Sequence, residues 1–363
     1  MALAPKPGIL DIVPYIGGRA HVAGVAEAHK LSSNESALGP SPMALEAYRA
    51  AAGGLSIYPE GSAQLLREAL AQHYGLDPSR IVCGNGSDEL IGLLTKAYAG
   101  PGDEVLYSQH GFLMYPIAAK AAGAKPVTAP ERNLIADVDA LLKAVTPRTR
   151  MVFLANPNNP TGTYLSSEEV RRLHAGLPKS VLLVIDAAYA EYVQRNDYEP
   201  GVALVEASQN VVMTRTFSKI YALAGLRVGW AYVSAPVADV LNRVRNPFNL
   251  NAAAQAAAVA ALDDVAATDR AREHNDIWRP WLARELEALG LTVNPSVGNF
   301  VIARFPGERR KTADAVFEFL KSRGILTRKI GGYGLPEWLR IGIGTEEEMR
   351  AVVQACADFL KQP

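Results

Sequence analysis

The stretch TRTFSKIYALAGLRVGW, residues 214–230, places Lys219 directly after an apolar run that is typical of a buried strand. Arg227 follows eight residues later, after a glycine-containing segment. A lysine amine attacks an aldehyde only when it has lost its proton, and burial among apolar side chains lowers its pKa toward neutrality. The stretch therefore suggests an imine-forming lysine beside an arginine that anchors a phosphate. The alternative is a solvated lysine at the end of an element, because lysines are rarely buried.

The surrounding sequence predicts an α/β fold. Short apolar runs alternate with segments of helical periodicity between residues 80 and 235, and several of the apolar runs are continuous, as in strands buried on both faces. Such a succession favours a mostly parallel sheet covered by helices. The expected strands are 80–84, 103–108, 125–129, 150–155, 180–186, 210–216 and 227–234. The expected helices are 87–99, 111–122, 137–145 and 167–176, the last opened by Ser166 and Glu169 at capping-box spacing.

The remainder of the chain predicts a second, smaller domain. Residues 251–289 are rich in Ala, Glu, Arg and Leu, which indicates one or two long helices linking the two domains. After Gly290 the pattern changes to strands at 291–293, 299–305, 325–330 and 338–344, with helices at 311–323 and 346–361. We therefore expect a large domain over 41–250, linking helices over 251–289 and a small α+β domain over 290–363. Residues 1–40 are expected to pack on the small domain and the cleft.

Composition narrows the class of function. The 363 residues include 37 basic and 37 acidic side chains, so no net charge favours nucleic acid or an anionic membrane as a partner. The two cysteines lack metal-ligand spacing, and such a low count is typical of a reducing compartment. No signal peptide and no apolar run of about 20 residues is present. These features predict a cytoplasmic enzyme with a small-molecule substrate and without a metal or a disulfide.

Two loops follow predicted strands and carry candidate binding residues. GNGSDE, residues 84–89, opens a helix, where the free backbone amides of Gly86, Ser87 and Asp88 and the helix dipole favour a phosphate. An ordinary helix cap is the alternative. NPNNPTG, residues 156–162, forms a rigid turn that presents the amide of Asn159, although it is also explained as a plain turn.

Two further strand ends complete the set. Asp186 ends the strand 180–186 and Tyr189 follows it, while Thr216, Ser218 and Lys219 follow the next strand. Ligands bind beyond the carboxyl ends of parallel strands, so we expect these side chains to meet at one edge of the sheet. An N-cap is again the alternative for Asp186.

An amine, a strand-end carboxylate and a phosphate-binding loop are what pyridoxal 5'-phosphate requires. We predict that Asp186 pairs with the pyridine nitrogen and that Asn159 and Tyr189 bind the ring hydroxyl. The phosphate is expected to bind the amides of residues 86–88 and the side chains of Thr216, Ser218 and Arg227.

The motifs together resemble a known family. KLSSNESALGPSP (30–42), GNGSDE, NPNNPTG, DAAY (186–189), SKIYALAGLRVGW and LRIGIGT are similar to those of the class II, fold-type I aminotransferases, and within these to the histidinol-phosphate aminotransferases. They occur in the same order over nearly the whole chain. The sequence departs from the family at Ser36, Ala37, Ala187 and Phe112, which stands where a tyrosine is usual.

The resemblance implies roles for individual residues. It makes Lys219 the Schiff-base lysine and Phe112 the ring stacked on the cofactor, in a fold-type I homodimer whose Tyr58 reaches the partner subunit's phosphate site. Arg340 in LRIGIGT is implied to bind the acidic group of the substrate, and the further substrate contacts implied are Tyr15, Asn34 and Arg328. For Arg340 the alternative is a cross-strand salt bridge.

The implied reaction is amino transfer from histidinol phosphate to 2-oxoglutarate, in which Lys219 acts as nucleophile and base. An aromatic amino donor fits the same residues. A decarboxylase acting on a phosphorylated amino acid is a further alternative, because related enzymes share the cofactor and the lysine. A cofactor-sensing transcription regulator is disfavoured, since the chain has no additional DNA-binding segment.

Overall fold

Seven strands form the large sheet of this computed structural model, which describes residues 4–18, 28–305, 307 and 311–362. In spatial order they are β2 (Ile81–Asn85), β10 (Val228–Tyr232), β9 (Val211–Thr216), β8 (Leu182–Asp186), β7 (Thr149–Ala155), β3 (Glu104–Ser108) and β4 (Lys125–Ala129). All neighbours run parallel except β10, which is antiparallel to both β2 and β9. The predicted mostly parallel sheet is confirmed.

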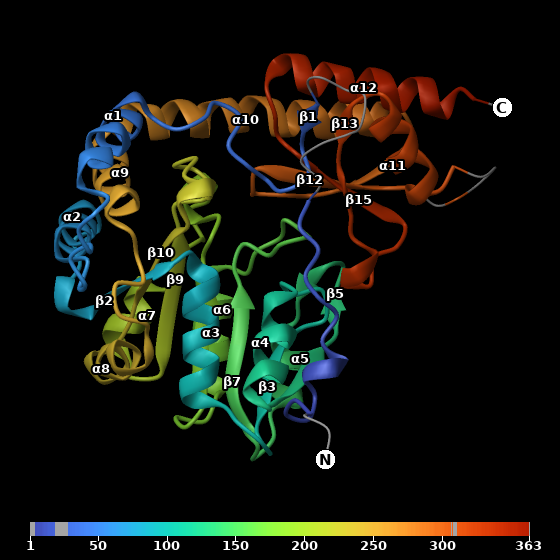
Figure 1. Cartoon of the computed structure of the whole chain (residues 1–363). Helices are drawn as coiled ribbons and strands as arrows, with labels where there is room; N and C mark the ends of the chain where they lie inside the picture. Colours follow the sequence, from blue (N-terminus) through green and yellow to red (C-terminus); the bar gives the residue numbers. More distant parts are fainter. Residues whose placement is uncertain (1–3, 19–27, 306, 308–310, 363) are drawn as a thin grey trace.

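The continuous apolar strands are buried on both faces, as expected. In β8, Leu183 and Ile185 belong to one hydrophobic cluster, while Leu182 and Val184 belong to another on the opposite face. One face is covered by α3 (Ser87–Tyr98), α4 (Met114–Ala122) and α8 (Ala235–Val244). The other is covered by α5 (Val138–Ala144), α6 (Ser167–Gly176) and α7 (Val202–Ala207). Three further helices, α1 (Pro42–Ala50), α2 (Gln64–Tyr74) and α9 (Ala252–Asp263), pack together at the β2 edge (Figure 1).

Of the one or two helices expected over 251–289, the structure has two, because α9 ends at Asp263 and α10 (Val265–Ala288) begins after the N-cap Asp264. In Figure 1, α10 extends from the vicinity of α1 and α9 to the small sheet. Pro280 lies inside α10, where it removes a backbone donor. No helix in the described part of the chain is long and apolar enough to cross a membrane.

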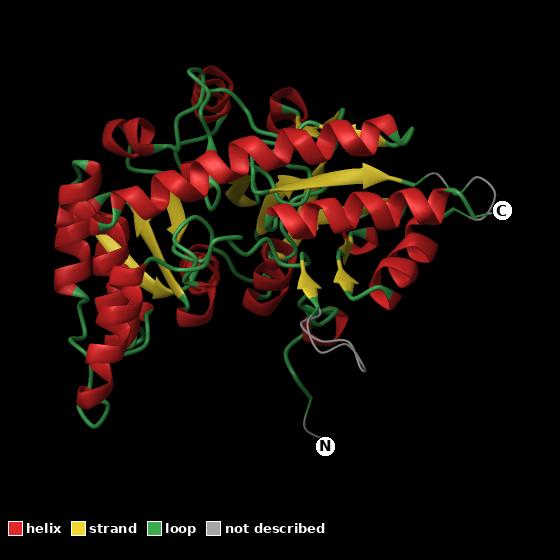
Figure 2. Cartoon of the chain, turned by 90° about the horizontal axis from the view of Figure 1, so that it is seen from above, coloured by secondary structure: helices red, strands yellow, loops and turns green. Residues whose placement is uncertain are grey.

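A second sheet forms the C-terminal part and has its own hydrophobic cluster. Its spatial order is β11 (Thr292–Asn294), β12 (Phe300–Arg304), β15 (Trp338–Gly342) and β14 (Arg328–Lys329), packed by α11 (Ala313–Ser322) and α12 (Glu346–Leu360). Figure 2 shows two separate groups of strands, each bordered by helices. Two short antiparallel strands, β5 (Glu131–Arg132) and β6 (Ile135–Ala136), lie outside both sheets.

The strand expected at 325–330 is split at Thr327. Its first half, β13 (Ile325–Leu326), pairs in parallel with β1 (His29–Lys30), whereas β14 joins the small sheet. One apolar run therefore serves two pairings, and the N-terminal segment is tied to the C-terminal part through β1.

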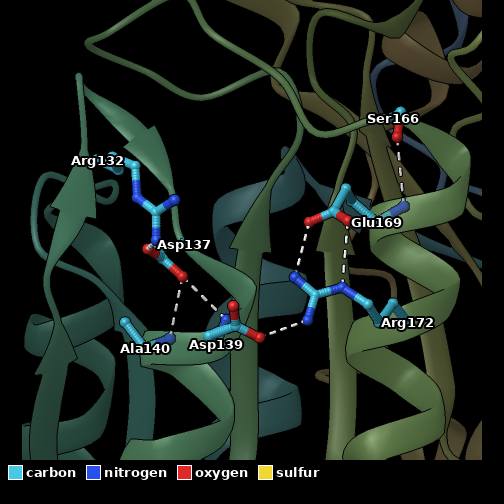
Figure 3. Close-up of polar contacts among 7 residues, drawn as sticks. All are labelled: Arg132, Asp137, Asp139, Ala140, Ser166, Glu169 and Arg172. Carbon is cyan, nitrogen blue, oxygen red and sulfur yellow. Dashed lines mark hydrogen bonds and ion pairs between the residues drawn. The ribbon is translucent and has the colours of Figure 1, made fainter.

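The capping box expected at Ser166 is only half formed. The Ser166 hydroxyl accepts from the backbone N–H of Glu169, but the Glu169 carboxylate pairs with Arg172 instead of returning to the cap. Arg172 also donates to Asp139 at 2.5 Å, which joins α6 to α5 (Figure 3). The competing cation one turn further along the helix explains the difference.

Turns and single-turn helices connect these elements. The 3-10 helices are η1 (Ile9–Asp11), η2 (Ala51–Gly54), η3 (Pro78–Arg80), η4 (Ala190–Tyr192), η5 (Ala224–Leu226) and η7 (Gly331–Tyr333). Of these, η4 follows β8 and η5 lies between β9 and β10, both next to the candidate site.

Candidate active site

The candidate site is a pocket of about 230 Å³ at the carboxyl ends of the parallel strands. The predicted residues that line it come from nine separate stretches of sequence. They are Tyr15, Asn34, Ser87, Asp88, Phe112, Asn159, Asp186, Tyr189, Thr216, Ser218, Lys219, Arg227 and Arg340. Their convergence follows from the parallel topology, which brings the ends of β7, β8 and β9 to one edge.

Lys219 lies three residues beyond the end of β9 and is half-buried. Its amine donates a 2.9 Å hydrogen bond to the backbone carbonyl of Ser33 and lies 5.6 Å from the ring centre of Tyr189. Burial, together with the positive charge of Arg340, lowers the pKa of Lys219 to about 8. The amine is therefore unprotonated far more often near neutral pH than that of an ordinary lysine.

Asp186 ends β8 and is 5% exposed. Its carboxylate accepts hydrogen bonds from the phenol of Tyr115 at 2.8 Å and from the hydroxyl of Thr214 at 3.3 Å. Burial raises the pKa of Asp186 to about 6, although both hydrogen bonds oppose this shift. Neither partner was predicted from the sequence.

Tyr189 is buried just after β8, and its hydroxyl accepts a 3.0 Å hydrogen bond from the side-chain amide of Asn34. Burial raises the pKa of Tyr189, while the charge of Arg340 opposes the rise. The phenol is therefore neutral at physiological pH and able to donate its proton to an acceptor in the pocket.

The start of α3 and Arg227 form a cradle for an anion. The N-cap of α3 is Gly86, which provides no side-chain cap for the amides of the first turn. Arg227 donates to Asp88 at 3.0 Å and to Ser218 at 3.2 Å, and a Cβ added to Gly86 would lie only 2.4 Å from its guanidinium. Thr216 accepts the backbone N–H of Ser218 at 3.1 Å. Free amides and an arginine around one helix start fit a phosphate.

Arg340 is buried and reaches the pocket from β15. Its guanidinium donates to the side-chain oxygen of Asn159, and to the carbonyl of Ser32 at 2.8 Å. Among the described residues Arg340 forms no ion pair, so the cross-strand salt bridge considered for it is not present. Arg340 is instead paired in register with Arg328 on β14, and of these two neighbours only Arg340 lines the pocket.

Phe112 and Tyr15 form the aromatic wall of the pocket. Their rings meet edge to face with centres 6.3 Å apart. Arg328 does not line this pocket; it lies over the Tyr15 ring and donates to the carbonyl of Ile16 at 2.5 Å, facing a larger neighbouring cavity.

Tyr58 lies outside the pocket of its own chain. It is 78% exposed and stacks on Phe248 with ring centres 4.7 Å apart. The family resemblance implies that Tyr58 reaches the cofactor site of a partner subunit. A single chain does not contain that site.

The pocket also contains residues that sequence reasoning missed. They are Gly18, Ser32, Ser33, Glu35, Ala155, Pro157, Ala188 and Ala224. Most contribute backbone atoms or small side chains, for which the sequence carries no chemical signal.

The comparisons with known proteins agree with this geometry. The family model for aminotransferase class I and II matches residues 26–356, and the chain belongs to this family. It is a pyridoxal-phosphate-dependent aminotransferase of fold type I, as predicted.

Individual relatives are similar over their whole length. The chain is 62% identical over 359 residues to the histidinol-phosphate aminotransferase of Paramagnetospirillum magneticum, covering 99% of both chains. It is 58% identical to that of Rhodospirillum centenum, covering 98% of each. The solved histidinol-phosphate aminotransferase of Sinorhizobium meliloti, in complex with pyridoxal-5'-phosphate, superposes with a TM-score of 0.91 at 32% identity, covering 99% of this chain and 98% of that one.

The residues present fit the cofactor. The uncapped start of α3 with Arg227 suits its phosphate, the buried carboxylate of Asp186 suits a protonated ring nitrogen, and Lys219 supplies the amine. Among the described residues, no group of three or more His, Cys, Asp or Glu is placed to hold a metal ion.

Proposed function

We propose that this enzyme transfers the amino group of histidinol phosphate to 2-oxoglutarate, giving imidazole acetol phosphate and glutamate in histidine biosynthesis. The observation that carries this proposal is the 62% identity, over 99% of both chains, to a histidinol-phosphate aminotransferase. The buried Arg340 inside the pocket, with Arg328 behind Tyr15, supports an anionic amino donor.

In the proposed mechanism Lys219 moves the proton. With a pKa of about 8, its unprotonated amine would take the proton from the substrate carbon and deliver it to a different carbon, as amino transfer requires. The bound cofactor supplies an electron-poor ring that accepts the electrons released by that carbon. Asp186, ionised above about pH 6, would keep the ring nitrogen protonated, and Tyr189 and Asn159 would bind the ring hydroxyl.

We assign the contacts with the substrate to Arg340, Asn34, Tyr15 and Arg328. Arg340 binds the acidic group of the substrate by its fork of donors, and Asn34 and Tyr15 position the remainder. Arg328 acts from behind Tyr15, over whose ring its guanidinium lies at 5.7 Å from the centre. The edge-to-face wall of Phe112 and Tyr15 accommodates a flat ring such as imidazole.

We further propose a cytoplasmic homodimer in which Tyr58 reaches the partner's phosphate site. Leu55, Ile57, Tyr58 and Leu65 are each more than 70% exposed, and such a cluster of exposed apolar side chains marks an interface. The cysteines, both buried free thiols, suit a reducing compartment.

Within each subunit we propose a large domain over 41–250 and a small one over 290–363, linked by 251–289. The expected packing of 1–40 on the small domain and the cleft is proposed for residues 4–18 and 28–40, because 1–3 and 19–27 lie outside the described residues. The separate hydrophobic clusters around the two sheets support this division.

The substrate assignment is tested by half-reactions. Cofactor-bound protein is mixed with L-histidinol phosphate, or separately with L-phenylalanine, without an oxo acid, and the cofactor absorbance is followed; 2-oxoglutarate is then added. We expect histidinol phosphate to convert the cofactor to its amino form far faster, and 2-oxoglutarate to reverse the change. A preference for phenylalanine would make the enzyme an aromatic aminotransferase, and release of carbon dioxide from a phosphorylated amino acid without amino transfer would make it a decarboxylase.

A further inference from the structure

The turn at residues 32–35 presents consecutive backbone carbonyls to side chains from distant parts of the chain. The carbonyl of Ser32 accepts from Arg340 at 2.8 Å, and that of Ser33 accepts from the amine of Lys219 at 2.9 Å. In the proposed mechanism both donors also bind a ligand: Arg340 binds the substrate and Lys219 binds the cofactor. These two hydrogen bonds are therefore the ones that ligand binding changes.

The next two carbonyls of the turn share one donor that has no catalytic task. The side-chain amide of Asn299 donates to the carbonyl of Asn34 at 3.0 Å and to that of Glu35 at 3.1 Å. Asn34 has a left-handed backbone with φ of 55°, a conformation that costs free energy for any residue with a Cβ. Its side chain in turn holds the hydroxyl of Tyr189. The strained residue is thus fixed from both sides.

Asn299 is itself held rigidly. It is 2% exposed, directly precedes β12, and its carbonyl accepts the backbone N–H of Ile343 at 2.9 Å. The following residue, Phe300, meets the Tyr189 ring edge to face at 5.3 Å and lies 5.6 Å below the guanidinium of Arg340. One strand start therefore contacts the turn, the phenol and the arginine of the site.

We propose that Asn299 is a positioning residue that keeps the turn at 32–35 in its strained form while Lys219 and Arg340 exchange partners during turnover. Its two hydrogen bonds are independent of cofactor and substrate, so they persist when the other two are broken. Loss of the amide leaves two buried carbonyls without this donor, which favours rotation of the turn. Such a rotation removes the acceptor of Lys219 and the anchor of Tyr189. The inference rests on the proposed role of Lys219.

The test compares Asn299→Leu with Asn275→Leu. Asn275 is a matched control, because it is also 2% exposed and also donates to a backbone carbonyl, that of Gly298, but does not bond the turn. In cofactor-free protein, the rate at which trinitrobenzenesulfonate modifies Lys219 is followed from pH 6 to 10 by peptide mass spectrometry. The dissociation constant of pyridoxal 5'-phosphate and the thermal midpoint are measured on the same samples.

Both variants are expected to lose thermal stability. Only Asn299→Leu is expected to lower the pH midpoint of Lys219 modification, by about one unit, because a carbonyl acceptor no longer stabilises the protonated amine. Its cofactor dissociation constant should rise about tenfold, the equivalent of one displaced hydrogen-bonded contact. Asn299→Gln, which keeps the amide, should partly restore both the pH midpoint of Lys219 modification and the affinity for the cofactor.

A midpoint and a cofactor affinity equal to those of Asn275→Leu would show a purely structural role and overturn the inference. The proposed function is judged separately by Lys219→Ala. If that variant retains turnover, the role of Lys219 is wrong whatever Asn299 does; if it is inactive while Asn299→Leu matches the control, only the positioning role fails.

Discussion

The phenol of Tyr115 donates a 2.8 Å hydrogen bond to Asp186 across 71 residues of sequence, and both side chains are buried. The bond stabilises the ionised carboxylate, yet burial dominates and the pKa of Asp186 is about 6. A carboxylate in this state is suited to a positively charged ring nitrogen. Without one, it carries a charge that the interior compensates only in part.

Asp186→Asn should therefore stabilise the cofactor-free protein above pH 6 while impairing catalysis. The pKa of about 6 in the folded protein exceeds the ordinary aspartate value of 3.8, so the stability linked to this proton is present at low pH and is lost as pH rises through 6. The variant should gain up to about 2 kcal/mol at pH 7.5 relative to pH 4.5. Urea unfolding at both pH values measures this, and a gap that does not depend on pH would refute the assigned cause.

Lys219→Ala should lower kcat by at least about a thousandfold, because it removes both the nucleophile and the base. Single-turnover absorbance measurements with histidinol phosphate give the rate. Normal turnover would sink the assignment of Lys219. Lys219→Arg, which keeps the charge but not a titratable amine, should be similarly inactive, so that loss of charge alone is not the explanation.

Arg340→Met should raise the pKa of Lys219 above 8. The positive charge of Arg340 disfavours protonation of the amine, so its removal moves the midpoint of Lys219 modification to higher pH. Arg350→Met, on an exposed face of α12, serves as the control. An unchanged midpoint in Arg340→Met would mean that burial alone sets the pKa. The same variant should raise the KM for the amino donor.

Gly86→Ala should weaken cofactor binding at least about tenfold. Its Cβ would lie 2.4 Å from the Arg227 guanidinium, and its φ of 77° is unfavourable for alanine. Gly92→Ala, within α3 and with open space around the new methyl, should leave affinity intact and stabilise the helix by about 1 kcal/mol. Titration of both cofactor-free variants with pyridoxal 5'-phosphate decides the matter.

Leu55→Asp combined with Ile57→Asp should yield monomers with weakened cofactor binding. Both side chains are more than 70% exposed beside Tyr58, and charges there oppose burial against a second copy. Sedimentation velocity of the variant and the parent protein measures the assembly. A variant that remains dimeric would place the interface elsewhere.

The sequence allowed the prediction of the large sheet because its strands are continuous apolar runs and its helices have regular periodicity. The candidate site was predictable from the positions of these strands, because residues that follow parallel strands lie at one edge of the sheet. Lys219, Asp186 and Asn159 all line one pocket.

The partners of these residues were not predictable, because they depend on lateral register and on tertiary packing. Thr214 lies next to Asp186 only through the pairing of β8 with β9, and Tyr115 only because α4 packs over the sheet. Asn299 follows no strand of the large sheet, so the rule that located the other residues did not reach it. The split at Thr327 likewise depends on β1, which is distant in sequence.

The order of residues along the chain has a consequence for biosynthesis of the enzyme. The anchor of Ser32 is Arg340, 308 positions later, and Asn299 clamps the same turn from 265 positions away. During synthesis, Lys219, Asp186 and the start of α3 leave the ribosome well before Arg340 does. The hydrogen bonds that hold the turn at 32–35 can form only after the final strand has paired, so the active site is completed at the end of synthesis. Because these contacts join residues far apart in the sequence, we expect this last folding step to be slow.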